Sequence, residues 1–137
     1  MPNTAEEAEI YVDGASRGNP GPAGIGYVIK TRDRTFKHHE YIGKTTNNQA
    51  EYTALIKALE EAAAIGVKKA KVYSDSALLV KQVKGEFRVR NRRLAELRRM
   101  VLDSVSKFEE FDIIHVDREK NREADGLANQ AIDSFTP

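Results

Sequence analysis

The order of strand-like and helix-like segments is the feature that most constrains the fold of this chain. Residues 10–12 form a short apolar run that ends at Asp13-Gly14, a common turn dipeptide. Residues 14–26 are rich in Gly and Pro, and we expect a structured turn there. Residues 26–31 and 35–43 then have the composition of two further strands. The first third of the chain is therefore predicted to form three strands joined by tight connections.

Helical spacing begins after this first third. Thr46 and Gln49 have the spacing of a capping box, which predicts a helix start, and apolar residues keep a helical period up to Gly66. Beyond this helix the two kinds of segment alternate. We expect further strands at residues 69–74 and 111–116, and further helices at 75–84, at 91–107 and from about residue 121 onward.

This order of segments predicts the architecture. Strands joined by tight turns pair antiparallel, whereas strands joined through helices favour parallel pairing. We therefore expect an α/β fold with a five-stranded mixed sheet, in which three antiparallel strands are followed by two parallel ones, and with helices on both faces. A length of 137 residues lies within the usual size of one domain, so we expect a single domain over residues 1–137.

The composition excludes several classes of protein. The chain has no cysteine, which excludes disulfides, thiolate metal sites and a cysteine nucleophile. No apolar run approaches the roughly 18–20 residues of a membrane span. Residues 1–9 are polar and acidic, so we expect neither a secretory signal nor membrane association. A monomer in a reducing cytoplasm is the expected form of the protein.

The charge is unevenly distributed along the chain. The formal net charge is only +1, but residues 81–99 hold eight cations and two anions, a local balance of +6. Such a basic segment attracts phosphate groups, although it is equally consistent with a solvated, arginine-rich helix face. The candidates for phosphate contact within it are Arg88, Arg90, Arg92 and Arg93.

Four carboxylates fall at positions where they could serve chemistry. Asp13 is predicted at the end of the first strand and Asp75 at the end of the fourth, whereas Glu51 falls in the opening turns of the first helix. Asp125 falls near the start of the last helix. Taken alone, Asp13 could be a turn residue and Asp75 a helix N-cap. The helix dipole favours an acidic residue at Glu51, and Asp125 could simply face water.

The positions of these carboxylates nevertheless predict a common site. Sites in open sheets form at the carboxyl ends of strands, and Asp13 and Asp75 would lie close together if their strands pair in parallel. Four carboxylates at one point repel each other unless cations bind or protons are taken up. Hard divalent cations such as Mg²⁺ bind oxygen ligands and commonly retain water or phosphate. Convergence of the four side chains would therefore create a site for Mg²⁺.

Four segments of the chain resemble motifs of the type 1 ribonuclease H family. They are YVDGASRGNPGPAG at residues 11–24, TTNNQAE at 45–51, YSDS at 73–76 and NREADGLA at 121–128. All four occur in order and on the expected elements, and the resemblance covers nearly all of the chain. The resemblance implies an endonuclease that hydrolyses the RNA strand of RNA/DNA hybrids.

The resemblance also implies a role for the four carboxylates. The catalytic and metal-binding residues would be Asp13, Glu51, Asp75 and Asp125. Two Mg²⁺ ions, for which Mn²⁺ is the expected substitute, would support hydrolysis that leaves a 5′-phosphate and a 3′-hydroxyl. Asp13 would be the ligand that the two ions share.

Contacts to the hybrid are implied by the same resemblance. The residues concerned are Gly14, Ala15, Ser16, Asn19, Asn47 and Asn48. Together with Glu51, the backbone of residues 14–16 would contact ribose 2′-hydroxyls, which DNA lacks. The asparagines would grip both strands in the minor groove, although Asn47 and Asn48 could also cap the helix. Because such contacts depend on backbone shape, little sequence preference is expected.

The chain departs from the family pattern at two places. Many members carry a loop histidine before the last helix, but here that link is DREK, residues 117–120. Arg118 is the candidate substitute, because its permanent charge would lie near the scissile phosphate. His115 falls inside the strand pattern and is expected to be packed or at the sheet edge. The chain also lacks Trp, and with it the Trp-containing basic protrusion of some members, so residues 81–99 could supply phosphate contacts instead.

Other functions fit the sequence less well. A phosphate-binding loop would need Gly five residues before Gly43-Lys44, where this chain has His38. The glycines of residues 14–26 precede a strand, whereas a dinucleotide fingerprint precedes a helix. Transposase-like and exonuclease relatives usually carry further domains, for which we expect no room in 137 residues. The remaining alternative is a non-catalytic nucleic-acid-binding module of the same fold; the loss of a carboxylate would mark it, and all four are present.

Overall fold

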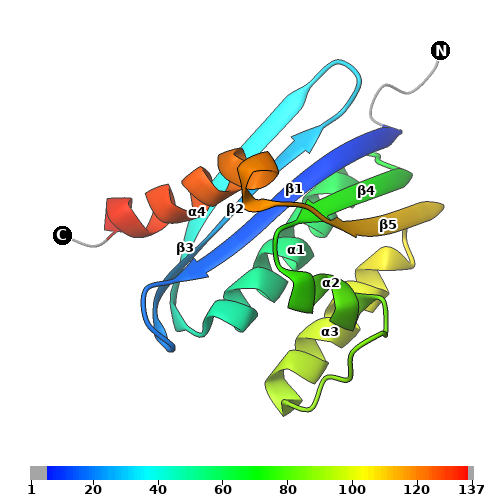
Figure 1. Cartoon of the computed structure of the whole chain (residues 1–137). Coiled ribbons are helices and arrows are strands. Elements are labelled where there is room, and N and C mark those ends of the chain that lie inside the picture. Colours follow the sequence, from blue (N-terminus) through cyan, green and yellow to red (C-terminus); the bar gives the residue numbers. More distant parts are fainter. Residues whose placement is uncertain (1–5, 136–137) are drawn as a thin grey trace.

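The computed structural model describes residues 6–135, which form one sheet with helices on both faces (Figure 1). Residues 1–5, part of the stretch in which we expected no secretory signal, lie outside the described range. The strands are β1 (Glu7–Ser16), β2 (Gly21–Lys30), β3 (Thr35–Thr45), β4 (Lys69–Ser74) and β5 (Glu110–His115). The helices are α1 (Asn47–Ala64), α2 (Ala77–Val83), α3 (Arg92–Val105) and α4 (Arg122–Phe135), with a 3-10 turn, η1 (Arg118–Asn121), before α4. Within the described part of the chain, no helix combines the length and the apolar character that crossing a membrane requires.

The sheet has the predicted topology. Its strand order is β3-β2-β1-β4-β5. The pairs β1–β2 and β2–β3 are antiparallel, and the pairs β1–β4 and β4–β5 are parallel. The expectation of three antiparallel strands followed by two parallel ones is confirmed. The pairing of β1 with β4 ends where Tyr11 lies beside Tyr73, and the two strands separate beyond that point.

The turn that we predicted over residues 14–26 is wrong for most of its length. β1 continues through Ser16 and β2 begins at Gly21, so residues 17–20 alone connect the two strands. Gly18 serves the turn in this connection, whereas Gly14, Gly24 and Gly26 permit close packing of helices on the strands. A Cβ atom on Gly26 would lie 2.5 Å from the backbone oxygen of Ala124, so α4 can rest on β2 only because that atom is absent. Because β1 continues through Ser16, Asp13 lies inside β1 and not at its end.

Local capping explains where the helices begin. Thr46 caps α1, because its side chain accepts a hydrogen bond from the Gln49 N–H at 3.2 Å. The Gln49 side chain accepts from the Thr45 hydroxyl at 2.9 Å and does not reach back to the cap, so only half of the predicted capping box forms. Asn91 caps α3 by accepting from the Leu94 N–H at 3.0 Å. These caps supply acceptors for backbone N–H groups that lack a partner inside the helix.

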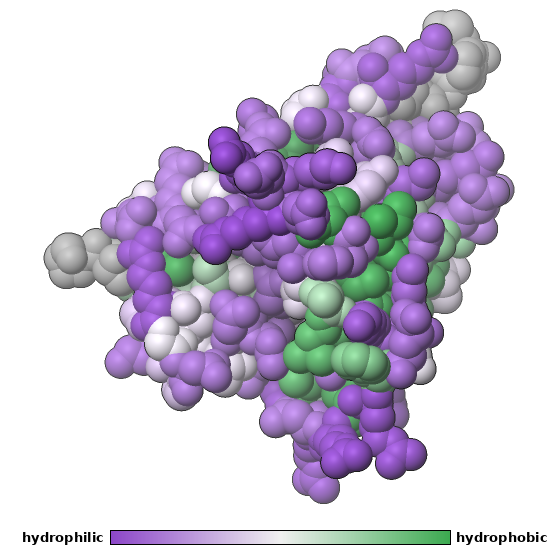
Figure 2. Space-filling view, viewed as in Figure 1, coloured by the Kyte–Doolittle hydropathy of each residue, from purple (hydrophilic) through white to green (hydrophobic). Residues whose placement is uncertain are grey.

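Two hydrophobic layers enclose the sheet. On one face, Ile10 of β1 and Val72 of β4 belong to the same core as Leu55 of α1, and α3 packs outside α1 (Figure 1). On the other face, α4 crosses β1, β2 and β3 and buries Ala128 and Ile132 completely. Figure 2 shows hydrophobic surface beside α4 on this second face, over β4, β5 and α2. On this face α4 therefore covers the antiparallel strands, and β4 and β5 lie beyond it.

Candidate active site

Three carboxylates meet where β1 and β4 separate. Tyr11 and Tyr73 are the last paired residues of the two strands, and Asp13 and Asp75 each follow two positions later. Alternate residues of a strand point to the same face, so Asp13 emerges on the face that carries Tyr11. Glu51 reaches the same place from α1. One oxygen of each carboxylate, Asp13, Glu51 and Asp75, lies within 4.8 Å of the other two.

The first turns of α1 hold Glu51 against β1. The Gly14 N–H donates a hydrogen bond to Oε1 of Glu51, whose exposed fraction is 4%. The helix approaches the strand so closely that a Cβ atom on Gly14 would lie 2.2 Å from the backbone carbon of Ala50. The sequence suggests a turn at Asp13-Gly14, but both residues belong to β1. Gly14 allows the helix to deliver a carboxylate to the strand.

Asp75 does not cap α2. That role belongs to Ser76, whose side chain accepts from the Leu79 N–H at 3.2 Å. The Ser76 N–H in turn donates to the hydroxyl of Ser74 at 3.0 Å. The N-cap interpretation of Asp75 is thus wrong, because the hydroxyls of Ser74 and Ser76 accept the hydrogen bonds at the start of α2. The half-buried carboxylate of Asp75 contributes to the cluster instead.

Asp125 lies beside the cluster and not inside it. It is in the first turn of α4, and it does not belong to the group whose oxygens lie within 4.8 Å of one another. Its charge is nevertheless close enough to raise the pKa of both Asp13 and Glu51. Oδ1 of Asp125 lies 3.5 Å from Nη2 of Arg118, and the exposed fractions of these two side chains are 27% and 77%. The carboxylate is therefore half-buried and paired with the arginine of η1, so the alternative that it simply faces water is wrong.

Burial and mutual repulsion dominate the electrostatics of the cluster. Burial is the main cause of the raised pKa of Asp13, and the charges of the other three carboxylates raise it further. Burial also raises the pKa of Glu51, against the lowering effect of hydrogen bonds from Gly14 and Asp13. The proton in the hydrogen bond between Asp13 and Glu51 raises the pKa of Asp13 and opposes the rise in the pKa of Glu51. A divalent cation would stabilise the ionised forms without the proton, and carboxylate oxygens are the ligands that Mg²⁺ and Mn²⁺ prefer. The donor set therefore fits such an ion.

Most of the expected hybrid contacts lie together around the start of α1, whereas Gly14 is buried and its N–H is bonded to Glu51. Oδ1 of Asn47 accepts from the Ser16 N–H at 3.3 Å, and the Asn47 N–H donates to Oδ1 of Asn19 at 3.2 Å. These bonds join the β1–β2 connection to the start of α1. Asn19, Asn47 and Asn48 are exposed, whereas Ala15 and Ser16 are half-buried. The cap of α1 is the residue before Asn47, so neither Asn47 nor Asn48 is needed for capping.

The basic segment, residues 81–99, runs from α2 through the connection to α3. The candidates for phosphate contact, Arg88, Arg90, Arg92 and Arg93, are all exposed. Arg98 has a structural role instead, because its Nε–H donates to the backbone oxygen of Gln82 at 2.7 Å and joins α3 to α2. The segment is thus divided between solvent-facing cations and one that supports the fold.

Sequence reasoning missed Phe87 in this segment, and it left the position of His115, outside the segment, undecided. Phe87 is 48% exposed, and the ammonium of Lys81 lies 4.8 Å from the centre of its ring. An aromatic residue inside a charged segment was the available signal. His115, the last residue of β5, is exposed and lies beside Ser74, so of the two expectations for it the edge position is confirmed and the packed one is wrong.

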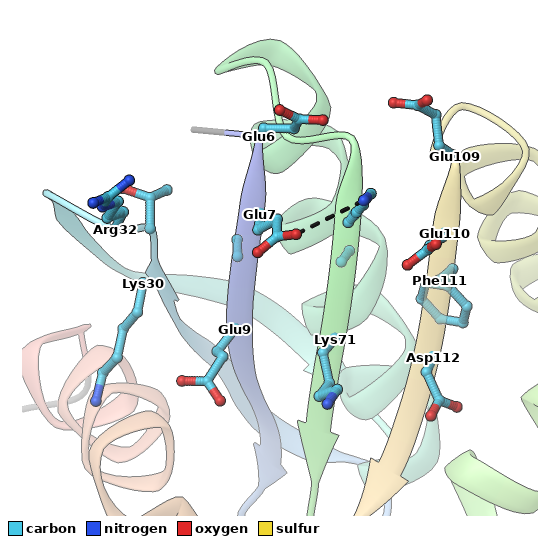
Figure 3. A pocket seen from close by; sticks show the side chains of 14 residues that line it. Glu6, Glu7, Glu9, Lys30, Arg32, Lys71, Glu109, Glu110, Phe111 and Asp112 are labelled. Atoms are coloured by element: carbon cyan, nitrogen blue, oxygen red, sulfur yellow. Dashed lines mark ion pairs between the residues drawn. The ribbon is translucent and has the colours of Figure 1, made fainter. Parts of the chain in front are cut away.

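A separate hollow lies at the opposite end of the sheet (Figure 3). It is lined by the amino ends of β1, β4 and β5, where acidic and basic side chains alternate. Glu7 and Lys69 form an ion pair across it, with 3.8 Å between Oε1 and Nζ. Asp13, inside the carboxyl-terminal half of β1, and Asp75, which follows β4, lie toward the other edge of the sheet. The hollow is therefore not part of the carboxylate cluster.

Comparisons with known sequences agree on one family. A family model described as reverse transcriptase-like matches residues 11–131. Ribonuclease HI of Halobacterium salinarum is 41% identical over 135 residues, which are 97% of this chain and 68% of that protein. The chain spans a smaller share, 35%, of the bifunctional protein Rv2228c of Mycobacterium tuberculosis, to which it is also 41% identical.

Solved structures share the fold over nearly their whole length. The crystal structure of RNase H1 from Halobacterium salinarum matches with a TM-score of 0.90 at 42% identity, and the match covers 93% of this chain and 98% of that one. LC11-RNase H1, isolated from compost by a metagenomic approach, was solved in complex with an RNA/DNA hybrid. That structure matches with a TM-score of 0.87 at 41% identity, over 93% of this chain and 97% of the other.

Proposed function

This chain belongs to the type 1 ribonuclease H family, and we propose that it is an endonuclease that hydrolyses the RNA strand of RNA/DNA hybrids. The observation that carries the proposal is the convergence of Asp13, Glu51 and Asp75, whose oxygens lie within 4.8 Å of one another, with Asp125 at their side. Such a cluster destabilises a protein unless it binds cations or takes up protons. The name of the Halobacterium relative and the hybrid bound to LC11-RNase H1 support the substrate. We assign this activity to one catalytic domain, residues 1–137.

Two Mg²⁺ ions are the proposed cofactors, with Mn²⁺ as the substitute. The residues that would hold them are Asp13, Glu51, Asp75 and Asp125. When bound, the ions supply activation of the attacking water and stabilisation of the leaving 3′ oxygen, which gives 5′-phosphate and 3′-hydroxyl products. The protein keeps the ligands in place before any ion arrives, because the Gly14 N–H fixes Glu51 and the surrounding core fixes the buried Asp13. Such preorganisation lowers the cost of binding and of reaction.

The choice of strand is assigned to the surface beside Glu51. Backbone groups of Gly14, Ala15 and Ser16 lie next to the carboxylates and are proposed to contact 2′-hydroxyls of the RNA strand, which are absent from DNA. Asn19, Asn47 and Asn48 are proposed to hold both strands across the minor groove. The hydrogen bonds among Ser16, Asn19 and Asn47 support this assignment, because they make the surface rigid.

Cations on two sides of the cluster have separate proposed roles. Arg118 is assigned to the scissile phosphate in place of a loop histidine, since its guanidinium lies 3.5 Å from Asp125 and is largely exposed. Arg88, Arg90, Arg92 and Arg93 are assigned to more distant phosphates of the hybrid, because their charges face solvent. Both assignments predict a loss of function on substitution.

The proposed working form is a monomer in a reducing cytoplasm. All four carboxylates come from one chain, so no second copy is needed to complete the site. The absence of cysteine makes the fold independent of disulfides, which suits a reducing compartment. The alternative function, a nucleic-acid-binding module without catalysis, differs from the proposal in one observable, namely cleavage.

A cleavage assay separates these two functions. End-labelled RNA/DNA hybrid is incubated with the protein in Mg²⁺, in Mn²⁺ or in chelator, and the products are resolved on a denaturing gel beside those of the Asp13→Asn variant. We expect metal-dependent cuts in the RNA strand by the parent protein and none by the variant, with duplex DNA left intact. Binding of the hybrid without metal-dependent cuts would instead establish the non-catalytic module.

A further inference from the structure

Asn121 connects the strand that carries Asp13 with the segment that carries Arg118. Its side chain is 1% exposed, at the last position of η1. Nδ2 donates a buried hydrogen bond of 2.9 Å to the backbone oxygen of Val12, the residue before Asp13. This bond joins elements 109 positions apart in the sequence. It lies one residue past the last β1–β4 pair, where the sheet no longer holds the strand on that side.

The other polar atom of this side chain makes no hydrogen bond within the described part of the chain. Oδ1 of Asn121 is buried and has no hydrogen-bond partner within residues 6–135. A buried acceptor without a partner costs about 1–3 kcal/mol. An amide chosen only for stability would have both of its polar ends satisfied, as the great majority of buried groups have. Unsatisfied groups of this kind concentrate where function demands a fixed geometry.

Asn121 lies between Arg118 and Asp125 in the sequence, the two residues of the ion pair beside the carboxylate cluster. Arg118 precedes it by three residues in the 3-10 turn, and side chains at this spacing lie one above the other. Asp125 follows it by four residues, the spacing of neighbours on one helix face. One buried anchor between them therefore sets the position of both, and the two side chains meet at 3.5 Å.

We propose that Asn121 is a positioning residue that fixes the Arg118–Asp125 pair relative to Asp13. The inference rests on the proposed nuclease function and adds a residue to its machinery. Asn121 touches neither substrate nor metal in this role. It acts through the placement of η1 and the first turn of α4, and a displacement of about 1 Å at such a site costs on the order of 100-fold in rate.

The test compares two buried amides. Asn121→Leu keeps the branched shape of the side chain and removes the donor to Val12, and Asn121→Ser is a smaller second variant in case the first folds poorly. Gln82→Leu is the matched control, because Gln82 is also buried, at 6% exposure, and accepts a hydrogen bond of 2.8 Å from the Tyr52 hydroxyl, a contact between α2 and α1 and not with η1 or α4. Each variant is assayed well below its own Tm, so that loss of folded protein does not enter the rates.

The kinetic readout distinguishes positioning from stability. We expect Asn121→Leu to lower kcat by about 30- to 100-fold with KM within about threefold, and Gln82→Leu to leave both near the parent values. We also expect the kcat loss to shrink at least about tenfold when Arg118→Ala is already present, because residues that act through one another are not additive. Equal losses in the two amide variants, or full additivity with Arg118→Ala, would overturn the proposal.

A second readout does not require activity. In metal-free and hybrid-free protein, NMR follows the carboxyl carbon of Asp125 and the Nε–H of Arg118. We expect both resonances to shift in Asn121→Leu and Asn121→Ser but not in Gln82→Leu. Unchanged resonances would overturn the positioning role even in an active enzyme. Shifted resonances in a parent chain that cuts no hybrid would leave the positioning intact and refute the nuclease function alone.

Discussion

The carboxylate of Glu51 and the backbone N–H of Gly14 form a buried hydrogen bond across 37 positions of the sequence. The bond joins the first turns of α1 to β1 immediately beside Asp13. It forms only because β1 has no side chain at residue 14, where the backbone of Ala50 occupies the space of a Cβ atom. The geometry of the carboxylate cluster therefore depends on how closely one helix approaches one strand.

Gly14→Ala should damage both folding and turnover. The new methyl group would lie 2.2 Å from a backbone carbon of α1, so the helix must move away and take Glu51 with it. Overpacking of this kind costs about 1–3 kcal/mol, and we expect a drop in Tm together with a loss of about 100-fold in kcat. Gly126→Ala is the matched control for stability, because a Cβ atom there meets nothing within 4 Å. A Gly14→Ala protein with parental kcat would show that the close approach has no catalytic importance.

Asp13→Asn should abolish turnover and yet stabilise the metal-free protein. The pKa of Asp13 is raised by burial and by three neighbouring carboxylates, so its ionised form is disfavoured in the folded state. An amide at this position removes the repulsion and keeps the shape. One unit of pKa shift corresponds to about 1.4 kcal/mol, and we expect a gain on the order of 1–3 kcal/mol near neutral pH. Urea unfolding in chelator measures the gain, and equal or lower stability of the variant would contradict the electrostatic account.

The gain from Asp13→Asn should grow with pH. Because the pKa of Asp13 is higher in the folded state, the folded protein holds the proton more tightly than the unfolded chain. The stabilisation of the folded state by this proton is complete below the ordinary pKa of 3.8 and is lost as the pH rises through the folded-state pKa. The parent should therefore weaken relative to Asp13→Asn between about pH 4 and about pH 8, with a slope of at most about 1.4 kcal/mol per pH unit.

Two comparisons isolate this pH effect. Asp33→Asn, which removes an exposed carboxylate from the β2–β3 connection, is the control and is measured over the same pH range. Saturating Mg²⁺ should stabilise the parent more than Asp13→Asn, since binding to the folded state alone adds to its stability. A difference between parent and Asp13→Asn that stays constant across the pH range would refute the raised pKa.

The sequence predicts the elements of this protein better than it predicts their contacts. Hydrophobic period and turn residues located the five strands and four α-helices of residues 6–135, because those signals are local, but they did not predict η1. The extent of β1 and β2 was wrong, since Gly24 and Gly26 look like turn residues until the helix packed on them is known. The role of Ser76 in place of Asp75 as a cap, and the buried position of Asn121, also depend on contacts between distant segments. No period or spacing contains that information.

Arg118→Ala should lower kcat more than it weakens binding. The guanidinium lies beside Asp125 and faces solvent, where it can meet a phosphate only in the bound complex. Loss of a positioned charge of this kind costs about 10- to 1,000-fold in kcat. Arg118→Lys should be intermediate, because a lysine keeps the charge without the planar pair of donors. Lys120→Ala removes an exposed cation from the same turn and serves as control; parental turnover in Arg118→Ala would remove this residue from the site.

Neutralising the exposed arginines of the basic segment should weaken binding and its dependence on salt. Arg88, Arg90, Arg92 and Arg93 are changed together to Gln in the Asp13→Asn background, so that hybrid binding is measured without cleavage. Each phosphate contact that is lost reduces the slope of log affinity against log salt by about 0.7–0.9, and four contacts would reduce it by roughly 3. The control carries the same change of charge at the other end of the sheet, through Arg32, Arg34, Lys68 and Lys71, which are all exposed. If both quadruple variants show the same slope as the parent, the basic segment is a solvated helix face, and phosphate binding must come from the residues around Asn19 and Asn47.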